Sequence, residues 1–85
     1  MDAALQWPWS RSLALAPVGR AVQVKTILFG TVKDYCSNRG IQPGTVLVCR
    51  EHGEEWLDLD LPTGTAMRLP RQYAWFISLD SSSLQ

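Results

Sequence analysis

The residues of this chain best suited to chemistry are two cysteines, one histidine and the acidic residues around that histidine. Cys36 and Cys49 stand apart without C-x-x-C spacing, and His52 is the sole histidine of the sequence. A closed zinc or iron–sulfur site takes four Cys or His ligands, so one chain cannot build such a site from these residues. The G-x-S-x-G and phosphate-loop spacings do not occur either. We therefore expect a protein that is not an enzyme.

A run of carboxylates next to the imidazole is the best candidate for a metal site. Glu51, His52, Glu54 and Glu55 fall on one predicted turn around Gly53. Such a mixture can hold zinc or another first-row divalent ion, with water completing the coordination. Adjacent residues on one turn rarely all converge, so the first interpretation is a solvated acidic loop. The alternatives are a weakly bound Zn or Fe ion at an exposed site, completed by a second chain, and a dedicated iron site in the monomer. No cofactor is expected to be required.

The two cysteines themselves are expected to be buried, unreactive core residues. Free cysteine is among the most buried residue types, and this favours a packing role for both Cys36 and Cys49 over a nucleophilic one. The N-terminus does not resemble a signal peptide, because Asp2 replaces a basic region and the apolar stretch at 13–18 is short. Free thiols in a reducing cytoplasm are the expectation.

Composition and charge exclude several classes of partner. Eight Lys or Arg residues balance eight Asp or Glu residues, which removes the electrostatic attraction that dominates nucleic-acid binding. No run of about 18 apolar residues occurs, so no segment is expected to insert into a membrane. With 85 residues, 46% of them hydrophobic and 19% charged, the chain should fold as one small domain.

Strand patterns recur along most of the sequence. The predicted strands cover residues 20–28, 45–50, 56–61, 65–69 and 75–79. In the first strand, Val22, Val24 and Leu28 should share one face. The second is apolar on both faces, which is typical of a strand covered on both sides. The third alternates strictly, with leucines on the buried face and two aspartates on the wet face.

One short helix is predicted between the first two strands. Residues 31–34 have the spacing of a capping box, which would start it. Gly40 can adopt positive φ and end the helix, with Ile41 contacting the last turn as in a Schellman cap. Pro43 and Gly44 then suit the two central positions of a type II turn that leads into the second strand.

The chain ends differ from this pattern. Residues 1–12 lack periodicity and are predicted to form an irregular N-terminal arm, and residues 81–85 a disordered tail. Trp7 and Trp9 in the arm each carry a large apolar surface. We expect them to close one end of the core, and the alternative is contact with a partner or with a second copy in a homodimer. About five short antiparallel strands with one short helix after the first indicate a mainly β protein, a small barrel spanning residues 13–80.

The order of these parts resembles the FeoA-like family of bacterial ferrous iron transport. The resemblance is carried by the segment 36–45, which has the family's helix end, Gly-apolar-x-Pro-Gly-Thr turn and departing strand. Further support comes from the segment 15–19, the hairpin glycine Gly64, and Leu69 followed by Ala74 and Ile77. The resemblance implies an SH3-like barrel, similar also to the C-terminal domain of iron-dependent repressors.

For function, the resemblance implies an accessory or regulatory protein that binds the cytosolic portion of a FeoB-type membrane permease. The predicted helix carries the best candidate surface for such a partner, with Tyr35, Asn38 and Arg39 at its exposed edge and Trp7 and Trp9 as second choice. Two other functions stay open. One is a metal-responsive regulatory module, and the other is an SH3-like peptide-binding module that uses exposed aromatic residues such as Tyr35, Tyr73 or Trp75.

Overall fold

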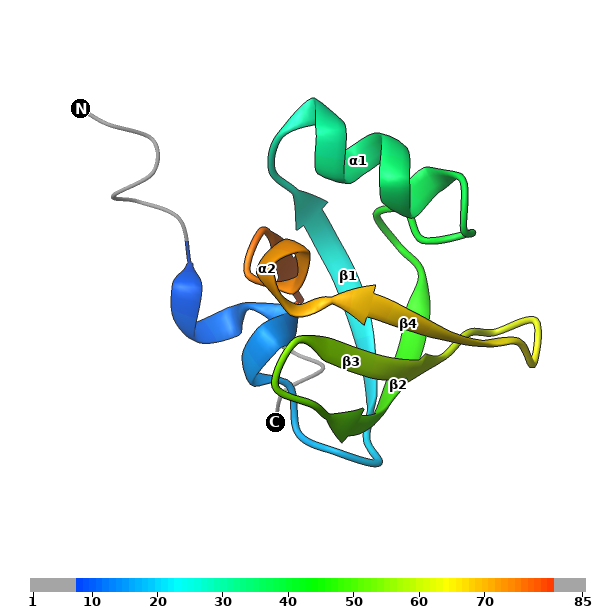
Figure 1. Ribbon diagram of the computed structural model, residues 1–85. Coiled ribbons are helices and arrows are strands. Elements are labelled where there is room, and N and C mark those ends of the chain that lie inside the picture. Colours follow the sequence, from blue (N-terminus) through cyan, green and yellow to red (C-terminus); the bar gives the residue numbers. More distant parts are fainter. Residues whose placement is uncertain (1–7, 81–85) are drawn as a thin grey trace.

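A five-stranded antiparallel sheet forms the frame of the protein (Figure 1). The structure, a computed structural model, describes residues 8–80. In chain order, that part contains 3-10 helices at Trp9–Arg11 and Leu13–Leu15, strand β1 (Ala21–Ile27), helix α1 (Gly30–Ser37), strands β2 (Val46–His52), β3 (Trp56–Asp60) and β4 (Ala66–Pro70), helix α2 (Arg71–Ala74) and strand β5 (Ile77–Leu79). The strands are arranged β4-β3-β2-β1-β5, so α2 connects the two edges of the sheet. The expected mainly β fold, with a short helix after the first strand, is confirmed.

The first strand changes its alternation part of the way along. Val22 and Val24 are buried as predicted, but Ile27 is the next buried residue and Leu28 is only half-buried. The pairing of β1 with β5 contains a register shift between Val24 and Thr26. A bulge adds one residue and so reverses which side chains face inward beyond it. The prediction that Leu28 shares one face with Val22 and Val24 was wrong for this reason.

Helix α1 begins without the predicted cap and ends as predicted. The residue that precedes it is Phe29, at φ 70°, and no side chain caps the first turn. The capping box was wrong because the N-cap position is held by Phe29, and Thr31, the second residue of the helix, lies two positions after it. At the other end Gly40 has φ 83°, and the amide of Ile41 donates to the Cys36 carbonyl at 2.9 Å. Together with the bond from the Gly40 amide to the Ser37 carbonyl, this is the predicted Schellman motif.

The turn after α1 also follows the prediction. Gly44 has φ 97°, and the amide of Thr45 donates to the carbonyl of Gln42 at 3.0 Å, which closes the turn around Pro43. The Gly44 amide further donates to the carbonyl of Val24 at 2.7 Å. The turn is therefore fixed to β1, and β2 leaves it in register with that strand.

Strand β2 occupies the middle of the sheet but is covered on one face only. Leu47 and Cys49 are fully buried, whereas the Val46 side chain is 46% exposed. The expectation of a strand covered on both faces was wrong, because the sheet curls around a single core and its outer face meets solvent. In β3 the strict alternation is confirmed, with Leu57 and Leu59 at 0% exposure.

The N-terminal residues of the described part pack into the same domain. Ser12, the last residue of the predicted arm, is buried and forms an isolated antiparallel bridge with Ser78. Its hydroxyl donates to the carbonyl of Ala74 at 2.9 Å and accepts from the amide of Ala14 at 3.1 Å. This side chain therefore joins the N-terminal 3-10 helices to α2.

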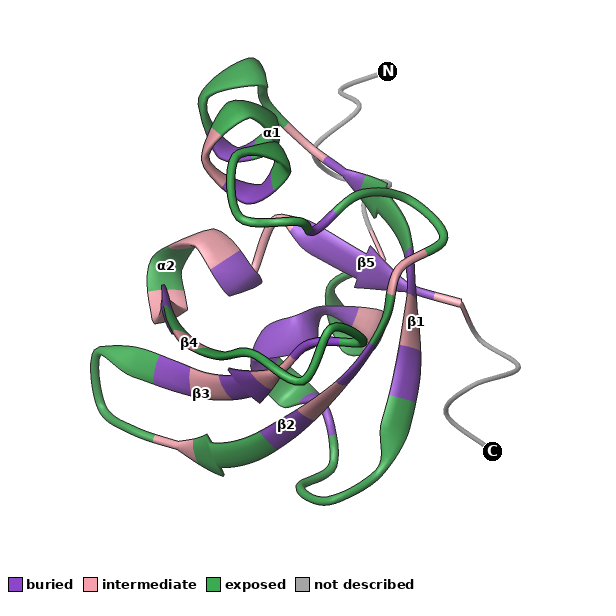
Figure 2. Cartoon of the chain, turned by 90° about the vertical axis from the view of Figure 1, so that its right-hand side faces the viewer, coloured by how far each residue is buried: buried purple, intermediate pink, exposed green. Residues whose placement is uncertain are grey.

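The core contains residues of every strand and of both α-helices. Figure 2 marks the buried parts of the chain in purple. Its largest fully buried members are Leu13, Ile41, Leu47, Leu57, Leu59, Leu69, Ile77, Leu79, Val22, Val24, Cys36 and Cys49. Within residues 8–80, no buried side-chain nitrogen or oxygen lacks a hydrogen-bond partner. In this stretch, no helix is long and apolar enough to cross a membrane.

Candidate functional site

The residues predicted as metal ligands are divided between a strand and a turn. Strand β2 runs through Glu51 and His52, beyond the predicted strand end, because these residues pair with Asp58 and Leu57 of β3. Glu54 and Glu55 follow in the turn. The Nε2 atom of His52 lies 2.6 Å from the carbonyl oxygen of Ala16. Among residues 8–80, no three His, Cys, Asp or Glu side chains gather as a metal ion would require.

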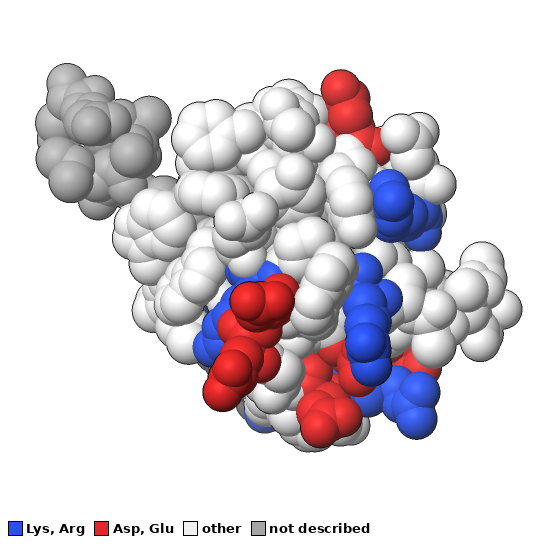
Figure 3. Space-filling view, viewed as in Figure 1, with Lys and Arg blue, Asp and Glu red and all other residues white. Residues whose placement is uncertain are grey.

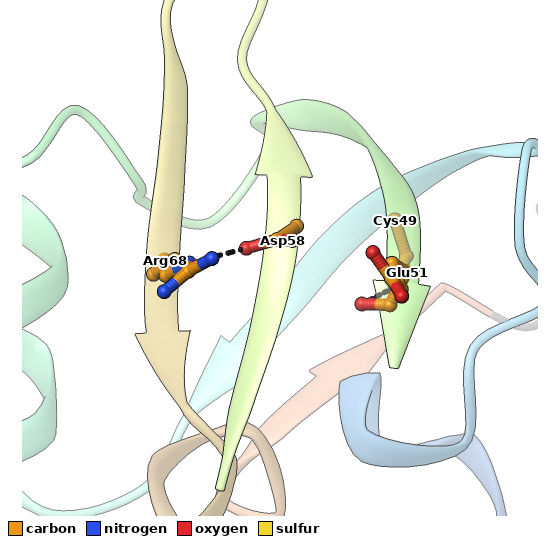
Figure 4. Close-up of polar contacts among 4 residues, drawn as sticks. All are labelled: Cys49, Glu51, Asp58 and Arg68. Carbon is orange, nitrogen blue, oxygen red and sulfur yellow. Dashed lines mark hydrogen bonds and ion pairs between the residues drawn. The ribbon is translucent and has the colours of Figure 1, made fainter. Parts of the chain in front are cut away.

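Both cysteines are free and fully buried. Burial raises the pKa of the Cys36 thiol from its ordinary value of 9.0 to about 11, against a smaller opposing effect of Arg39. Burial also raises the pKa of Cys49, whose Sγ–H donates to the carbonyl of Glu51 at 3.7 Å (Figure 4). A raised pKa removes the thiolate on which nucleophilic chemistry depends. The geometry agrees with the expected packing role of both residues.

The carboxylates on the solvent-facing side of β3 form ion pairs with arginines of the neighbouring strands. Asp58 Oδ1 accepts from Arg68 Nε at 3.0 Å, and Asp60 Oδ2 lies 3.5 Å from Arg50 Nε (Figure 4 shows the first pair). These exposed cross-strand pairs stabilise the sheet by a modest amount, about 1 kcal/mol or less each. They do not form a general acid–base pair.

The end of α1 places Arg39 against Tyr35. The guanidinium carbon lies 3.6 Å from the centre of the Tyr35 ring, and Arg39 Nη1 donates to the Tyr35 carbonyl at 3.1 Å. Tyr35 in turn meets Tyr73 edge to face, with ring centres 5.0 Å apart. Asn38 is exposed beside them. The structure therefore brings together Tyr35, Asn38 and Arg39, the three helix-edge residues of the predicted partner site.

A groove next to Arg39 was not predicted from the sequence. It has a volume of about 410 Å³, and its lining includes Arg39, Gly44, Val46, Leu61, Pro62 and Thr65. We call it the Arg39 groove. One signal in the sequence could have revealed the groove. Val46 is an apolar residue on the outer face of β2, and we had expected that face to be covered. The groove combines a cation at its rim with apolar walls.

The aromatic residues of the N-terminal segment lie on a second part of the surface. Trp9 is 39% exposed, and its ring centre lies 5.9 Å from Phe76 and 6.4 Å from Trp75. Phe29 meets Phe76 edge to face at 5.0 Å. Trp9 thus packs on the domain with one side and leaves the other open, and Trp7 lies outside the described residues.

Sequence comparisons and structural comparisons give different results for this chain. No family model matches the sequence, and no curated protein matches it. Solved structures do match the fold. One is the NMR structure of a FeoA-like protein from Clostridium acetobutylicum, with 21% identity and a TM-score of 0.71; the match covers 81% of this chain and 83% of that one.

Two further structures agree with the first. The crystal structure of an iron uptake regulatory protein (FeoA) has 17% identity and a TM-score of 0.73, and the match covers 80% of this chain and 92% of that one. The solution structure of FeoA from Chlorobium tepidum has 15% identity and a TM-score of 0.70, with 80% and 67% covered. The chain therefore has the small SH3-like barrel fold of these FeoA proteins, as the resemblance implied.

Proposed function

We propose that this chain is a FeoA-like accessory protein of bacterial ferrous iron uptake, and that it acts in the cytoplasm by binding the cytosolic portion of a FeoB-type permease. The observation that carries the proposal is the match in fold to FeoA proteins over about four fifths of the chain. The sequence resemblance at the end of α1 supports it independently, since the helix end and turn have the predicted geometry.

The Arg39 groove and the helix edge beside it are the proposed contact surface. A planar guanidinium can pair bidentately with a partner carboxylate while Val46 and Leu61 offer apolar contact. The ring of Tyr35 and the carbonyl of the same residue hold Arg39 in place. Because the guanidinium is already ordered, less side-chain entropy is lost when a partner binds.

The test is a binding titration between the full chain and the cytosolic portion of the permease from the same organism. We expect Arg39→Glu to weaken association at least about tenfold, equivalent to 1.4 kcal/mol, because it places a carboxylate where a carboxylate should bind. Val46→Asp should weaken it similarly, because it places a charge in the apolar lining of the groove. The matched control is Lys25→Glu, an equal charge reversal at an exposed β1 position outside the groove.

Stability must be followed in the same experiment. Arg39→Glu removes the contact with the Tyr35 ring, which is worth about 0.5 to 1 kcal/mol at an exposed site. A loss of 1 kcal/mol lowers the melting temperature of a domain this size by about 4 to 8 °C. Equal affinity of all variants, measured well below their melting temperatures, would rule out the Arg39 groove as the contact surface. Absence of binding by the parent chain would reject the permease as partner.

A cellular measurement tests the wider role. Deleting the gene should reduce uptake of radiolabelled Fe²⁺ by the host cell, and the parent gene should restore it. Uptake that is unchanged by the deletion would contradict a role in ferrous iron transport.

A further inference from the structure

A depression between the β2–β3 turn and α2 combines aromatic walls with carboxylates. It has a volume of about 530 Å³, and its lining includes Glu54, Glu55, Trp56, Pro70, Arg71 and Trp75. We call it the tryptophan pocket. It is distinct from the Arg39 groove, with which it shares no lining residue.

The carboxylates of this pocket have no cation of their own. Within the described residues, the acidic partners in the ion pairs of the neighbouring strands are Asp58 and Asp60, and neither Glu54 nor Glu55 takes part in an ion pair. Both glutamates are exposed. The one basic lining residue, Arg71, donates through Nη1 to the carbonyl of Gly53 at 3.0 Å. Two carboxylates against one guanidinium leave the lining net negative.

Two tryptophans, Trp56 and Trp75, form the aromatic part of the lining. The Trp56 side chain is 44% exposed although it begins a strand that pairs with β4, where its partner is Pro70. Trp75 lies just beyond α2 and stacks at an angle on Trp9, with ring centres 6.4 Å apart. A tryptophan face attracts cations through its quadrupole and is the strongest of the aromatic side chains in doing so.

The turn that carries the glutamates is fixed to α2. The Arg71 amide donates to the Glu55 carbonyl at 2.8 Å, in addition to the side-chain bond from Arg71 to Gly53. Gly53 also donates its amide to the Trp56 carbonyl at 2.7 Å, and a Cβ at Gly53 would lie 2.8 Å from that oxygen. Only glycine allows so close an approach, so the sequence itself keeps the turn tight. The pocket is therefore largely formed before a ligand arrives.

We propose that the tryptophan pocket binds an arginine side chain presented by an extended segment of a partner polypeptide. Arginine fits better than lysine because a planar guanidinium can stack on an indole and pair with a carboxylate in the same pose. The partner is a polypeptide because free arginine would bring its own carboxylate towards Glu54 and Glu55. Around the pocket, the surface that covers α2 and reaches α1 shows almost no charge, and acidic and basic side chains border it (Figure 3). This uncharged surface can receive the apolar neighbours of the arginine.

The inference goes beyond the proposed function, and its test uses neither iron nor a permease. The probe is the peptide acetyl-Ala-Pro-Arg-Pro-Ala-amide, titrated into the isotopically labelled full chain while indole and backbone amide resonances are followed by NMR. We expect the resonances of Trp56 and Trp75 to shift. The dissociation constant of the peptide should be about 1 mM or lower. The same peptide with citrulline, which keeps the shape and removes the charge, should bind at least about fivefold more weakly. Free arginine should also bind more weakly than the peptide.

Variants locate the site. The double variant Glu54→Gln, Glu55→Gln should lower the affinity for the arginine peptide at least about fivefold. Trp56→Ala should lower the affinity by a similar factor, because it removes an aromatic ring from the pocket. Glu51→Gln is the matched control, since Glu51 is an exposed glutamate of the same region that does not line the pocket. Equal binding of the arginine and citrulline peptides, shifts confined to other residues, or no shift up to about 5 mM peptide would each overturn the proposal.

Discussion

Phe29 holds an unusual backbone conformation for its residue type. It has φ 70° and ψ 134°, a region almost reserved for glycine, and its side chain is 55% exposed. A bulky residue held there costs about 1 to 3 kcal/mol. The edge-to-face contact with Phe76 stabilises the folded state by about 0.5 to 1.5 kcal/mol and so offsets part of this strain.

Two substitutions separate these effects. Phe29→Ala and Phe29→Gly both remove the ring contact, but only glycine relaxes the backbone. We therefore expect Phe29→Gly to be more stable than Phe29→Ala by about 1 kcal/mol or more in denaturant unfolding, despite the greater freedom of glycine in the unfolded chain. If the alanine variant is the more stable one, the residue before α1 is not strained.

Cys36 makes stability depend on pH in the alkaline range. Its folded pKa is raised, from 9.0 to about 11, because burial disfavours the thiolate. The unfolded chain therefore loses this proton first as pH rises, so the contribution to stability is complete below pH 9 and declines between pH 9 and about 11. Cys36→Ala is the necessary comparison, because it removes this thiol and leaves every other ionisable group in place. We expect the free energy of unfolding of the parent to fall more steeply over this window than that of Cys36→Ala, and parallel curves would contradict the burial of the thiol.

At the level of elements, the end of α1 depends on one glycine. Gly40 has φ 83°, and a Cβ there would meet no atom within 4 Å, so any penalty of substitution comes from the backbone alone. We expect Gly40→Val to lower stability by about 1 to 3 kcal/mol. Gly30→Ala is the control, because Gly30 also has open space around its Cβ but lies in α1 without positive φ. Denaturant midpoints measure both; a Gly40→Val variant as stable as the parent would mean that the helix does not end in a Schellman motif.

The sequence predicted elements well where local residues decide the geometry. The Schellman end at Gly40, the turn at Gly44 and the alternation of Leu57 and Leu59 all depend on residues within a few positions of each other. Features that depend on distant strands were missed. The bulge in β1 arises in its pairing with β5, and the exposure of Val46 depends on how the whole sheet curls.

The same division holds for the candidate sites. The proximity of Tyr35 and Arg39 could be predicted because the two residues are four positions apart at the end of α1. The tryptophan pocket was missed because Trp56 and Trp75 are far apart in the sequence and line the same pocket only after β3 pairs with β4 and α2 follows. The four candidate metal ligands are not gathered into one cluster of the described residues, because successive residues of a strand point to opposite faces and β2 runs through Glu51 and His52.

For the molecule as a whole, the energy of folding should come from the core alone. Buried side chains extend from the N-terminal 3-10 helices through every strand to β5, so one continuous apolar cluster joins both ends of the described chain. Structural zinc sites supply folding energy through several converging ligands. In the described part, His52 Nε2 instead contacts the carbonyl of Ala16, which ties β2 to the N-terminal segment.

We therefore predict that the fold is independent of metal. Thermal unfolding curves recorded with excess chelator and with added Zn²⁺ or Fe²⁺ under anaerobic conditions should coincide, because no bound ion would be lost or gained on unfolding. His52→Gln should lower the melting temperature equally in all conditions, since it disturbs the contact with Ala16 and not a metal. A large loss of melting temperature on chelation, abolished in His52→Gln, would show that a metal ion at the end of β2 contributes to stability, and the role of Glu51, Glu54 and Glu55 would then have to be assigned to that ion.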